Sequence, residues 1–446
     1  RQGAHRTRTH GETAAPAERD VCARNGFWAT IELLPVTAAL DRTHIHCIYI
    51  YRSYADANGT QTAMESGSAM KERYSVIHVI GGGEFGGAEE HIIRLMARLP
   101  EHGVRGKVVC FYEAGLSQAL REMGMEVEVL SYGRFDLRLI AGLRRLFERA
   151  RPDVIHTHGV KANFFARLAA DGLRKAPPLV TTVHSLLRYD YLNPFAYFGA
   201  HLMETTTRRR NRHFIAVSRS IRASLIEDGV AESDITVVHH GIDYERFAAA
   251  RGSLRAEYGI PDDAFVIGAV TRLVKIKAMD DLIRAMPRIV RERPDARLVL
   301  VGSGPEEEAL RKLAWDQGVE EHVLFTGFRR DIPACMHSFD VFVSASLSEG
   351  LGLNVLEAMA AGRPVVATAV GGILDLIEDE VNGLLVMTKV SGDLADAILD
   401  LMRHPDKAAR LGRTAAEHVR THFSLDAMAR NTVRVYDRLL AERLPS

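Results

Sequence analysis

Short apolar runs alternate with segments of helical periodicity along most of the chain, and this alternation constrains the fold more than any other feature. Runs such as YSVIHVI (74–80), DVIHTHG (153–159) and FVIGAVTRL (265–273) are continuously apolar rather than alternating in polarity. Continuous runs are typical of parallel strands that are buried on both faces. Segments with helical spacing, such as AEEHIIRLMARLP (88–100), separate them. The pattern predicts an α/β protein whose parallel sheets are covered by helices on both sides.

The alternation stops once and then restarts. A polar, turn-rich stretch follows ITVVHHG (235–241), and a second strand–helix series begins at residue 265. We therefore predict two Rossmann-like domains with parallel sheets that face a central cleft, where ligands bind outside the carboxyl ends of the strands. The predicted parts are an N-terminal domain (70–243), a linker (244–261), a C-terminal domain (262–425) and a C-terminal helix (426–446) that packs back toward the N-terminal domain.

The first 69 residues differ from the rest of the chain. They are polar, aperiodic and rich in turn-forming residues, and they lack the apolar core of a signal peptide. Met70 directly precedes the first convincing buried strand. We expect residues 1–69 to be an extension outside the fold, and we expect the folded protein to begin at Met70.

Composition excludes several classes of protein. The 446 residues are 47% hydrophobic and 26% charged, with zero net charge, which fits an ordinary globular protein and gives no basic field for nucleic acid. No apolar run reaches the roughly 18 residues that a spanning helix needs. The cysteines lack metal-site spacing and indicate no disulfide framework, so we expect a cytoplasmic protein. They are Cys22, Cys47, Cys110 and Cys335.

A glycine-rich loop follows the first predicted strand. Gly81, Gly83 and Gly86 have G-x-G-x-x-G spacing before a helix, which alone would suggest a nicotinamide dinucleotide site with Glu113 as the ribose acceptor. The same loop suits any phosphate, because its backbone N–H groups can approach an anion closely. A tight turn without a ligand is the third interpretation.

Charged residues gather in two loops of the second domain. Arg272 and Lys277 follow a strand, and two cations there can clamp a pyrophosphate. Glu349 and Glu357 flank Gly350 and the start of a helix, whose free N–H groups add positive potential. One carboxylate suits a ribose diol and the other a hexose. The alternative is a glutamate that stabilises the helix dipole beside an unrelated loop acid.

These residues carry a family resemblance. The segment SEGLGLNVLEAMAAGRPVVAT (348–368) resembles the E-x7-E motif of family 4 glycosyltransferases, which have the GT-B fold. Further segments resemble the same family in the same order over residues 74 to about 425. They are GGAEEH, DVIHTHG, TVHS, AVSRSIRASL, HHGIDYERF, TRLVKIKAMDDLI, VGSGPEEEAL and TGFRRDIP.

The resemblance implies a retaining hexosyltransferase that uses a UDP- or GDP-type sugar donor without a metal or other cofactor. Arg272 and Lys277 match the cations at the donor phosphates, Glu357 the ribose ligand, and Glu349 and His184 the residues at the donor sugar. His184, Glu349, Arg272 and Lys277 are the predicted catalytic residues. The other predicted donor-binding residues are Gly86, Gly87, Gly302, Gly304, Phe328, Gly350, Gly352 and Leu353, with Ser303 and Pro305 beside the base pocket.

Two positions depart from the family pattern. His240 stands where the family usually has Asn, and Thr271 where it usually has Gly. Neither position has a predicted chemical role, but both lie in loops that set the geometry of the site.

The predicted acceptor is a glycan or a lipid-linked envelope precursor. The basic segments RFDLRLIAGLRRLFERAR (134–151) and TTTRRRNRHF (205–214) combine arginines with apolar residues and are typical of contact with anionic lipid at the inner face of a membrane. An amphipathic helix packed on a sheet is the alternative for the first of them. A sugar-nucleotide epimerase of the same architecture, a nicotinamide oxidoreductase and a non-catalytic sugar-nucleotide binding protein are the competing functions.

Overall fold

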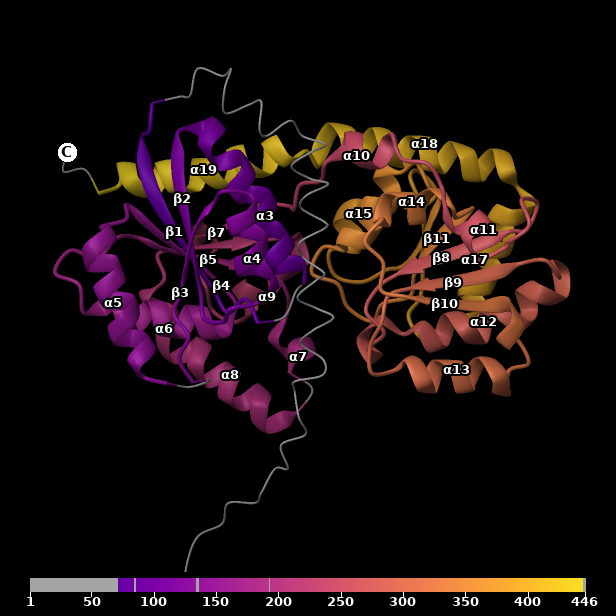
Figure 1. Ribbon diagram of the computed structural model, residues 1–446, viewed down its shortest axis with the longest axis horizontal. Coiled ribbons are helices and arrows are strands. Elements are labelled where there is room, and N and C mark those ends of the chain that lie inside the picture. The colour runs from indigo at the N-terminus through magenta and orange to yellow at the C-terminus, as the bar shows by residue number, and fades with distance from the viewer. Residues whose placement is uncertain (1–70, 84–85, 134–135, 192, 444–446) are drawn as a thin grey trace, which may run out of the picture. The chain divides into compact units, whose positions relative to one another are not determined.

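The computed structural model describes residues 71–83, 86–133, 136–191 and 193–443 (Figure 1). The predicted extension and the predicted start at Met70 lie outside the described residues. Among the described residues, no helix combines the length and the apolar composition that crossing a membrane requires.

The first sheet has seven parallel strands in the order β3-β2-β1-β4-β5-β6-β7. Its central strands are almost wholly buried, as the continuous apolar runs predicted. The order reverses between β1 and β4, which places the natural ligand crevice at their carboxyl ends. The strands are β1 (Tyr74–Ile80), β2 (Val104–Cys110), β3 (Glu126–Val129), β4 (Val154–His158), β5 (Leu179–Val183), β6 (His213–Ala216) and β7 (Ile235–Val237). The helices of this part are α3 (Gly87–Arg98), α4 (Gly115–Glu122), α5 (Arg138–Ala150), α6 (Val160–Asp171), α7 (Leu187–Asp190), α8 (Pro194–Thr207) and α9 (Arg219–Glu227).

The second sheet repeats this topology with six parallel strands in the order β10-β9-β8-β11-β12-β13. Its order reverses between β8 and β11, so a second crevice is expected at their carboxyl ends. The strands are β8 (Val266–Val270), β9 (Arg297–Val301), β10 (Val323–Gly327), β11 (Val341–Ser344), β12 (Val365–Thr368) and β13 (Leu384–Val386). The helices are α12 (Met279–Glu292), α13 (Glu307–Asp316), α14 (Ile332–His337), α15 (Leu353–Ala360), α16 (Ile373–Leu376), α17 (Ser391–Arg403) and α18 (Pro405–His422). The predicted fold class, two parallel-sheet Rossmann-like domains, is confirmed.

Two chain segments connect the two domains. The predicted linker contains two short helices, α10 (Tyr244–Ala248) and α11 (Leu254–Glu257), instead of being wholly irregular. The final helix, α19 (Leu425–Ala441), lies against α3 of the first domain and buries Tyr436 completely. The chain therefore returns to its first domain after completing the second.

The apolar face of helix α5 is buried in the first domain. Leu139, Leu143, Leu146 and Phe147 are at most 1% exposed and belong to the core beside the first sheet. The alternative interpretation of this basic segment, an amphipathic helix packed on a sheet, therefore describes α5.

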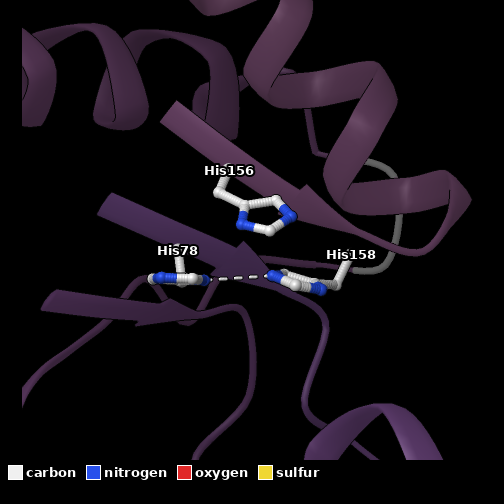
Figure 2. A group of neighbouring side chains, drawn as sticks. All are labelled: His78, His156 and His158. Carbon is white, nitrogen blue, oxygen red and sulfur yellow. Dashed lines mark hydrogen bonds between the residues drawn. The ribbon is translucent and has the colours of Figure 1, made fainter. Parts of the chain in front are cut away.

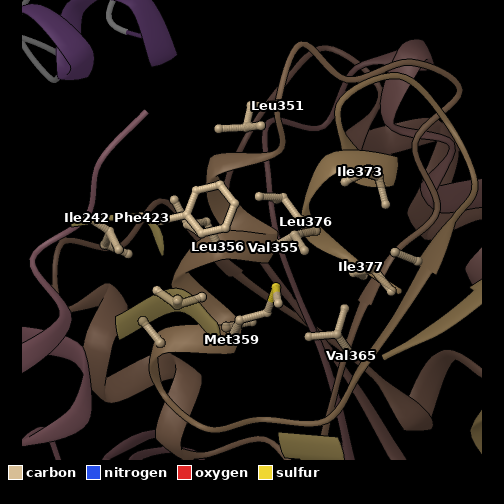
Figure 3. Close-up of a cluster of buried hydrophobic side chains, with 14 of the residues drawn as sticks. Ile242, Leu351, Val355, Leu356, Met359, Val365, Ile373, Leu376, Ile377 and Phe423 are labelled. Atoms are coloured by element: carbon tan, nitrogen blue, oxygen red, sulfur yellow. The ribbon is translucent and has the colours of Figure 1, made fainter. Parts of the chain in front are cut away.

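The helix of the E-x7-E segment is fixed by a dense apolar cluster (Figure 3). Val355, Leu356 and Met359 of α15 are fully buried. The cluster around them includes Leu351, Val365, Ile373, Leu376, Ile377 and Phe423. Burial on this scale makes α15 a rigid support for the carboxylates at and before its first turns.

Candidate active site

The loop before α15 requires glycine at several positions. Gly352 caps the helix with φ of 95°, a conformation that favours glycine. A Cβ at Gly350 would lie 2.0 Å from the carbonyl oxygen of His184. The loop of the second domain therefore packs directly against the end of β5 in the first domain, which brings the predicted residues His184 and Gly350 together.

Lys277 and Glu349 form an ion pair. The Lys277 Nζ atom donates to Glu349 Oε1 at 2.5 Å, and Ser346 Oγ donates to the same oxygen at 2.7 Å. Both members of the pair are largely buried, with side-chain exposures of 17% and 9%. Two residues predicted to hold adjacent parts of one ligand thus meet at the carboxyl ends of β8 and β11, at the switch point of the second sheet.

Arg272 lies exposed at the end of β8. Burial raises the pKa of Asp190 in the first domain, and the positive charge of Arg272 acts on the same carboxyl in the opposite direction. Arg272 is thus electrostatically coupled to the segment that follows His184.

Glu357 is held by an arginine from the other domain. Arg94 of α3 contacts Glu357 Oε1 at 3.1 Å, Glu90 Oε1 at 2.9 Å and the carbonyl oxygen of Gly241 at 3.1 Å. Burial raises the pKa of Glu357, and Arg94 opposes that shift. The predicted ribose ligand is therefore fixed by an arginine of the first domain. The sequence did not predict the role of Arg94. Its spacing from Glu90, four residues on a helix, was the available signal.

His184 belongs to a chain of four hydrogen-bonded imidazoles. Its Nε2 atom lies 3.1 Å from His158 Nδ1, and its Nδ1 atom lies 3.2 Å from His240 Nε2. His158 Nε2 in turn lies 3.1 Å from His78 Nδ1 (Figure 2). Each neutral ring can donate once and accept once. Both ring nitrogens of His184 are engaged, so its tautomer is coupled to those of its neighbours.

Two more histidines complete this cluster. His156 lies 4.3 Å from His158 between ring centroids, and His91 lies 4.8 Å from His240. Burial lowers the pKa of every ring in the cluster, to about 3 for His78 and His184. The cluster is therefore uncharged at neutral pH, and His184 would meet a ligand as a neutral imidazole.

Within the described part of the chain, His78, His156 and His158 also form the group of side chains with the spacing of metal ligands. Both nitrogens of His156 already have partners, the Tyr436 hydroxyl at 2.6 Å and Thr182 Oγ1 at 2.7 Å. His78 and His158 bond each other (Figure 2). Internal hydrogen bonds engage both nitrogens of His156 and one nitrogen of His78, whose Nε2 atom is buried without a partner.

The first glycine loop meets the second domain at one predicted residue. A Cβ at Gly87 would lie 3.4 Å from the Leu353 side chain of α15. Gly86 caps α3, and its N–H donates to Glu89 Oε2 at 3.1 Å. Both glycines thus lie at the N-terminus of α3.

The predicted base pocket lies beside β8. A Cβ at Gly302 would lie 1.9 Å from the carbonyl oxygen of Thr271, and one at Gly304 would lie 2.2 Å from that of Leu273. Close backbone packing therefore accounts for both glycines. Phe328, beyond β10, is 46% exposed.

A cavity of about 430 Å³ opens beside His184 in the first domain. It lies at the carboxyl ends of β1, β4 and β5, where the switch point of the first sheet predicts a ligand. Residues from the glycine loop, α6 and α8 complete its wall. They include Gly81, Lys161, Asn163, Tyr197, His201 and Glu204. Of the residues predicted for the transferase site, His184 lines this cavity and the others do not.

Comparison with known proteins gives the family. The model for "Glycosyltransferase Family 4" matches residues 85–246, and that for "Glycosyl transferases group 1" matches residues 250–418. An uncharacterized glycosyltransferase of Methanocaldococcus jannaschii is 32% identical over 294 residues, which cover 64% of this chain and 75% of the relative. The chain belongs to glycosyltransferase family 4.

Other relatives of this glycosyltransferase agree. A GDP-mannose-dependent phosphatidylinositol monomannoside mannosyltransferase of Mycobacterium tuberculosis is 38% identical over 201 residues, 42% of this chain and 52% of the relative. The crystal structure of Anabaena HepE with UDP-glucose superposes with a TM-score of 0.73 at 24% identity, covering 82% of this chain and the whole of that one. The predicted enzyme class and GT-B fold are confirmed, and the oxidoreductase and epimerase alternatives are not favoured.

Proposed function

We propose that this glycosyltransferase moves a hexose from a UDP- or GDP-type nucleotide sugar to a hydroxyl of a glycan or lipid-linked acceptor, with retention of the anomeric configuration. The observation that carries the proposal is the Lys277–Glu349 pair beside the N-terminus of α15, with Arg272 at the end of the same strand. Fixed positive charge at this point suits a diphosphate leaving group, and no metal is needed to supply it.

The proposed reaction is a displacement on one face of the sugar. The bond between the anomeric carbon and the diphosphate breaks, and the acceptor oxygen bonds to the same face. The proton of the acceptor hydroxyl passes to the departing phosphate oxygen. Arg272, Lys277 and the N–H groups of α15 stabilise the charge on the diphosphate, while Glu357 binds the ribose.

The known proteins support a nucleotide-sugar donor. The HepE structure contains UDP-glucose, and the mycobacterial relative is GDP-mannose-dependent and acts on a phosphatidylinositol mannoside. A lipid-linked acceptor would place this enzyme at the inner face of a membrane, and we include that peripheral location in the proposal.

A panel of donors tests the proposal. Thermal shifts with UDP, GDP, ADP, their sugars and NAD, with and without EDTA, should show stabilisation by one nucleoside diphosphate family that EDTA does not change. Proton NMR of the product formed with that donor should then show the anomeric configuration of the donor. An inverted product would overturn the mechanism, and donor conversion without any acceptor would indicate an epimerase.

A further inference from the structure

Helix α8 carries a stripe of exposed apolar side chains. Phe195 is 88% exposed, Phe198 66% and Leu202 50%. These residues are spaced i, i+3 and i+7, so they lie on one face of the helix. Large apolar residues that are exposed together on one face indicate an interaction surface. We call these three residues the α8 stripe.

The stripe belongs to a firmly anchored helix. The Asn193 side chain caps α8 by accepting from the Phe195 and Ala196 N–H groups at 2.9 and 3.3 Å. On the opposite face, Glu204 pairs with the fully buried Arg167 at 2.7 Å. Because both the start and the inner face are fixed, the outer face presents the stripe in a defined orientation.

The inner face of the same helix lines the cavity beside His184. Glu204 lies opposite Phe195 and Leu202 on the helix, and with Tyr197 and His201 on the adjoining side it is part of the cavity wall. Helix α8 therefore separates that cavity from the surface on which the stripe lies. A molecule held at the stripe is one helix diameter, about 10 Å, from the cavity.

Positive charge continues the stripe at its C-terminal end. Arg209 is exposed and lies in the 3-10 turn Arg208–Arg210 that follows α8 directly. Its neighbours Arg208 and Arg210 pair with Asp228 and Asp171. Apolar side chains followed by a cation are the pattern of a helix that lies in the interface of an anionic bilayer.

A second copy of the chain fits this surface less well. Three side chains cover much less than the roughly 800 Å² per partner that a stable dimer buries. Lipid offers both an apolar layer for the stripe and anionic head groups for Arg209.

We propose that the α8 stripe and Arg209 dock this enzyme on an anionic lipid surface. This inference rests on the proposed function, which places the enzyme at the inner face of a membrane, and it names the surface that makes the contact.

Co-sedimentation of the full chain with vesicles tests the docking. Vesicles of phosphatidylcholine with about one third phosphatidylglycerol should bind the protein, and phosphatidylcholine alone should bind it far less. The triple variant Phe195→Ser, Phe198→Ser, Leu202→Ser should lose most of this binding. Arg209→Glu should weaken it about fivefold or more, because each basic residue near the surface contributes. All four side chains are exposed, so the melting temperatures should not change.

Matched controls use exposed residues elsewhere. Trp315→Ser with Leu374→Ser removes comparable apolar surface, since these residues are 67% and 52% exposed, and Arg413→Glu reverses an exposed charge. Both controls should bind vesicles as the wild type does. Equal binding by the triple variant, or no binding by the wild type, would overturn the proposal. Dimerisation that the triple variant abolishes would assign the stripe to a second copy instead.

Donor turnover separates this proposal from the proposed function. The triple variant should retain the wild-type rate of donor turnover in solution, because none of its residues lines the cavity or contacts the predicted donor site. Vesicle binding without any transferase activity would leave the docking intact and refute the proposed function. Transferase activity without vesicle binding would refute the docking and leave the transfer reaction of the proposed function intact.

Discussion

At the scale of single residues, charged side chains of the site are paired before any ligand arrives. Glu357 accepts from Arg94, which lies 263 residues earlier in the chain, and Glu349 accepts from Lys277. Burial raises the pKa of Glu357, and the positive charge of Arg94 opposes that shift. A donor that binds here meets preorganised acceptors.

Arg94 should be a positioning residue for donor binding. Arg94→Met removes the charge that opposes the raised pKa of Glu357. The carboxyl then protonates more readily and loses its fixed orientation. We expect the KM for the nucleotide sugar to rise about tenfold, a loss of about 1.4 kcal/mol, with little change in kcat. Arg94→Lys should recover part of the loss. Arg98→Met, at a partly exposed position of the same helix, is the control. An unchanged or lower KM in Arg94→Met would contradict the role.

Substitutions at the sugar end and at the nucleotide end of the donor should change different kinetic parameters. His184→Ala and Glu349→Ala should lower kcat by about a hundredfold or more and leave the Kd for the nucleotide nearly unchanged, because their predicted contacts are with the sugar. Glu357→Ala should mainly weaken nucleotide binding. Calorimetry with the nucleoside diphosphate and initial-rate kinetics measure these two effects. Equal changes in Kd and kcat in all three variants would contradict the assigned roles.

At the scale of elements, the strands and helices were predictable and the contacts between them were not. Continuous apolar runs predicted buried parallel strands, and the glycines around residue 350 predicted the turn into α15. The Arg94–Glu357 pair and the imidazole chain could not be predicted from the sequence, because each joins elements that are far apart along it. His240 was recognised as a departure from the family pattern, yet its place at the end of the chain through His184 required the fold.

The loop before α15 gives an element-scale prediction. Gly350→Ala places a Cβ 2.0 Å from the His184 carbonyl oxygen, and backbone cannot yield as a flexible side chain does. We expect a loss of about 1–3 kcal/mol in unfolding free energy, together with lower activity. Gly392→Ala in α17 is the matched control, since a Cβ there meets nothing within 4 Å. The control should be neutral or slightly stabilising. Urea denaturation measures both, and equal stability of the two variants would show that the loop contact has been misjudged.

At the scale of the whole molecule, the histidine cluster ties the first sheet to helices from both ends of the described chain. Its six rings come from β1, β4, α3 and the loops after β5 and β7, and Tyr436 of α19 bonds one of them. The rings are His78, His91, His156, His158, His184 and His240. Burial lowers the pKa of His240, and the positive charge of Arg94 lowers it further.

This cluster should make the fold sensitive to mild acid. Burial lowers the pKa of each ring below its usual value near 6.5. Below that pH the unfolded chain therefore binds protons that the native state does not bind. Stability is therefore complete above about pH 6.5 and falls as the pH drops toward 3. Each ring costs about 1.4 kcal/mol at one pH unit below 6.5, so the summed loss near pH 5.5 is comparable with the whole stability of a typical domain.

Urea denaturation between pH 8 and pH 5.5 measures this effect directly. The slope of unfolding free energy against pH gives the number of protons taken up on unfolding, and it should exceed what a single histidine provides. His240→Asn should reduce that number by about one. A pH-independent stability over this range would mean that the rings can hold protons in the native state. The imidazole chain would then be a set of charged groups with water between them rather than the neutral, mutually bonded network that fixes His184.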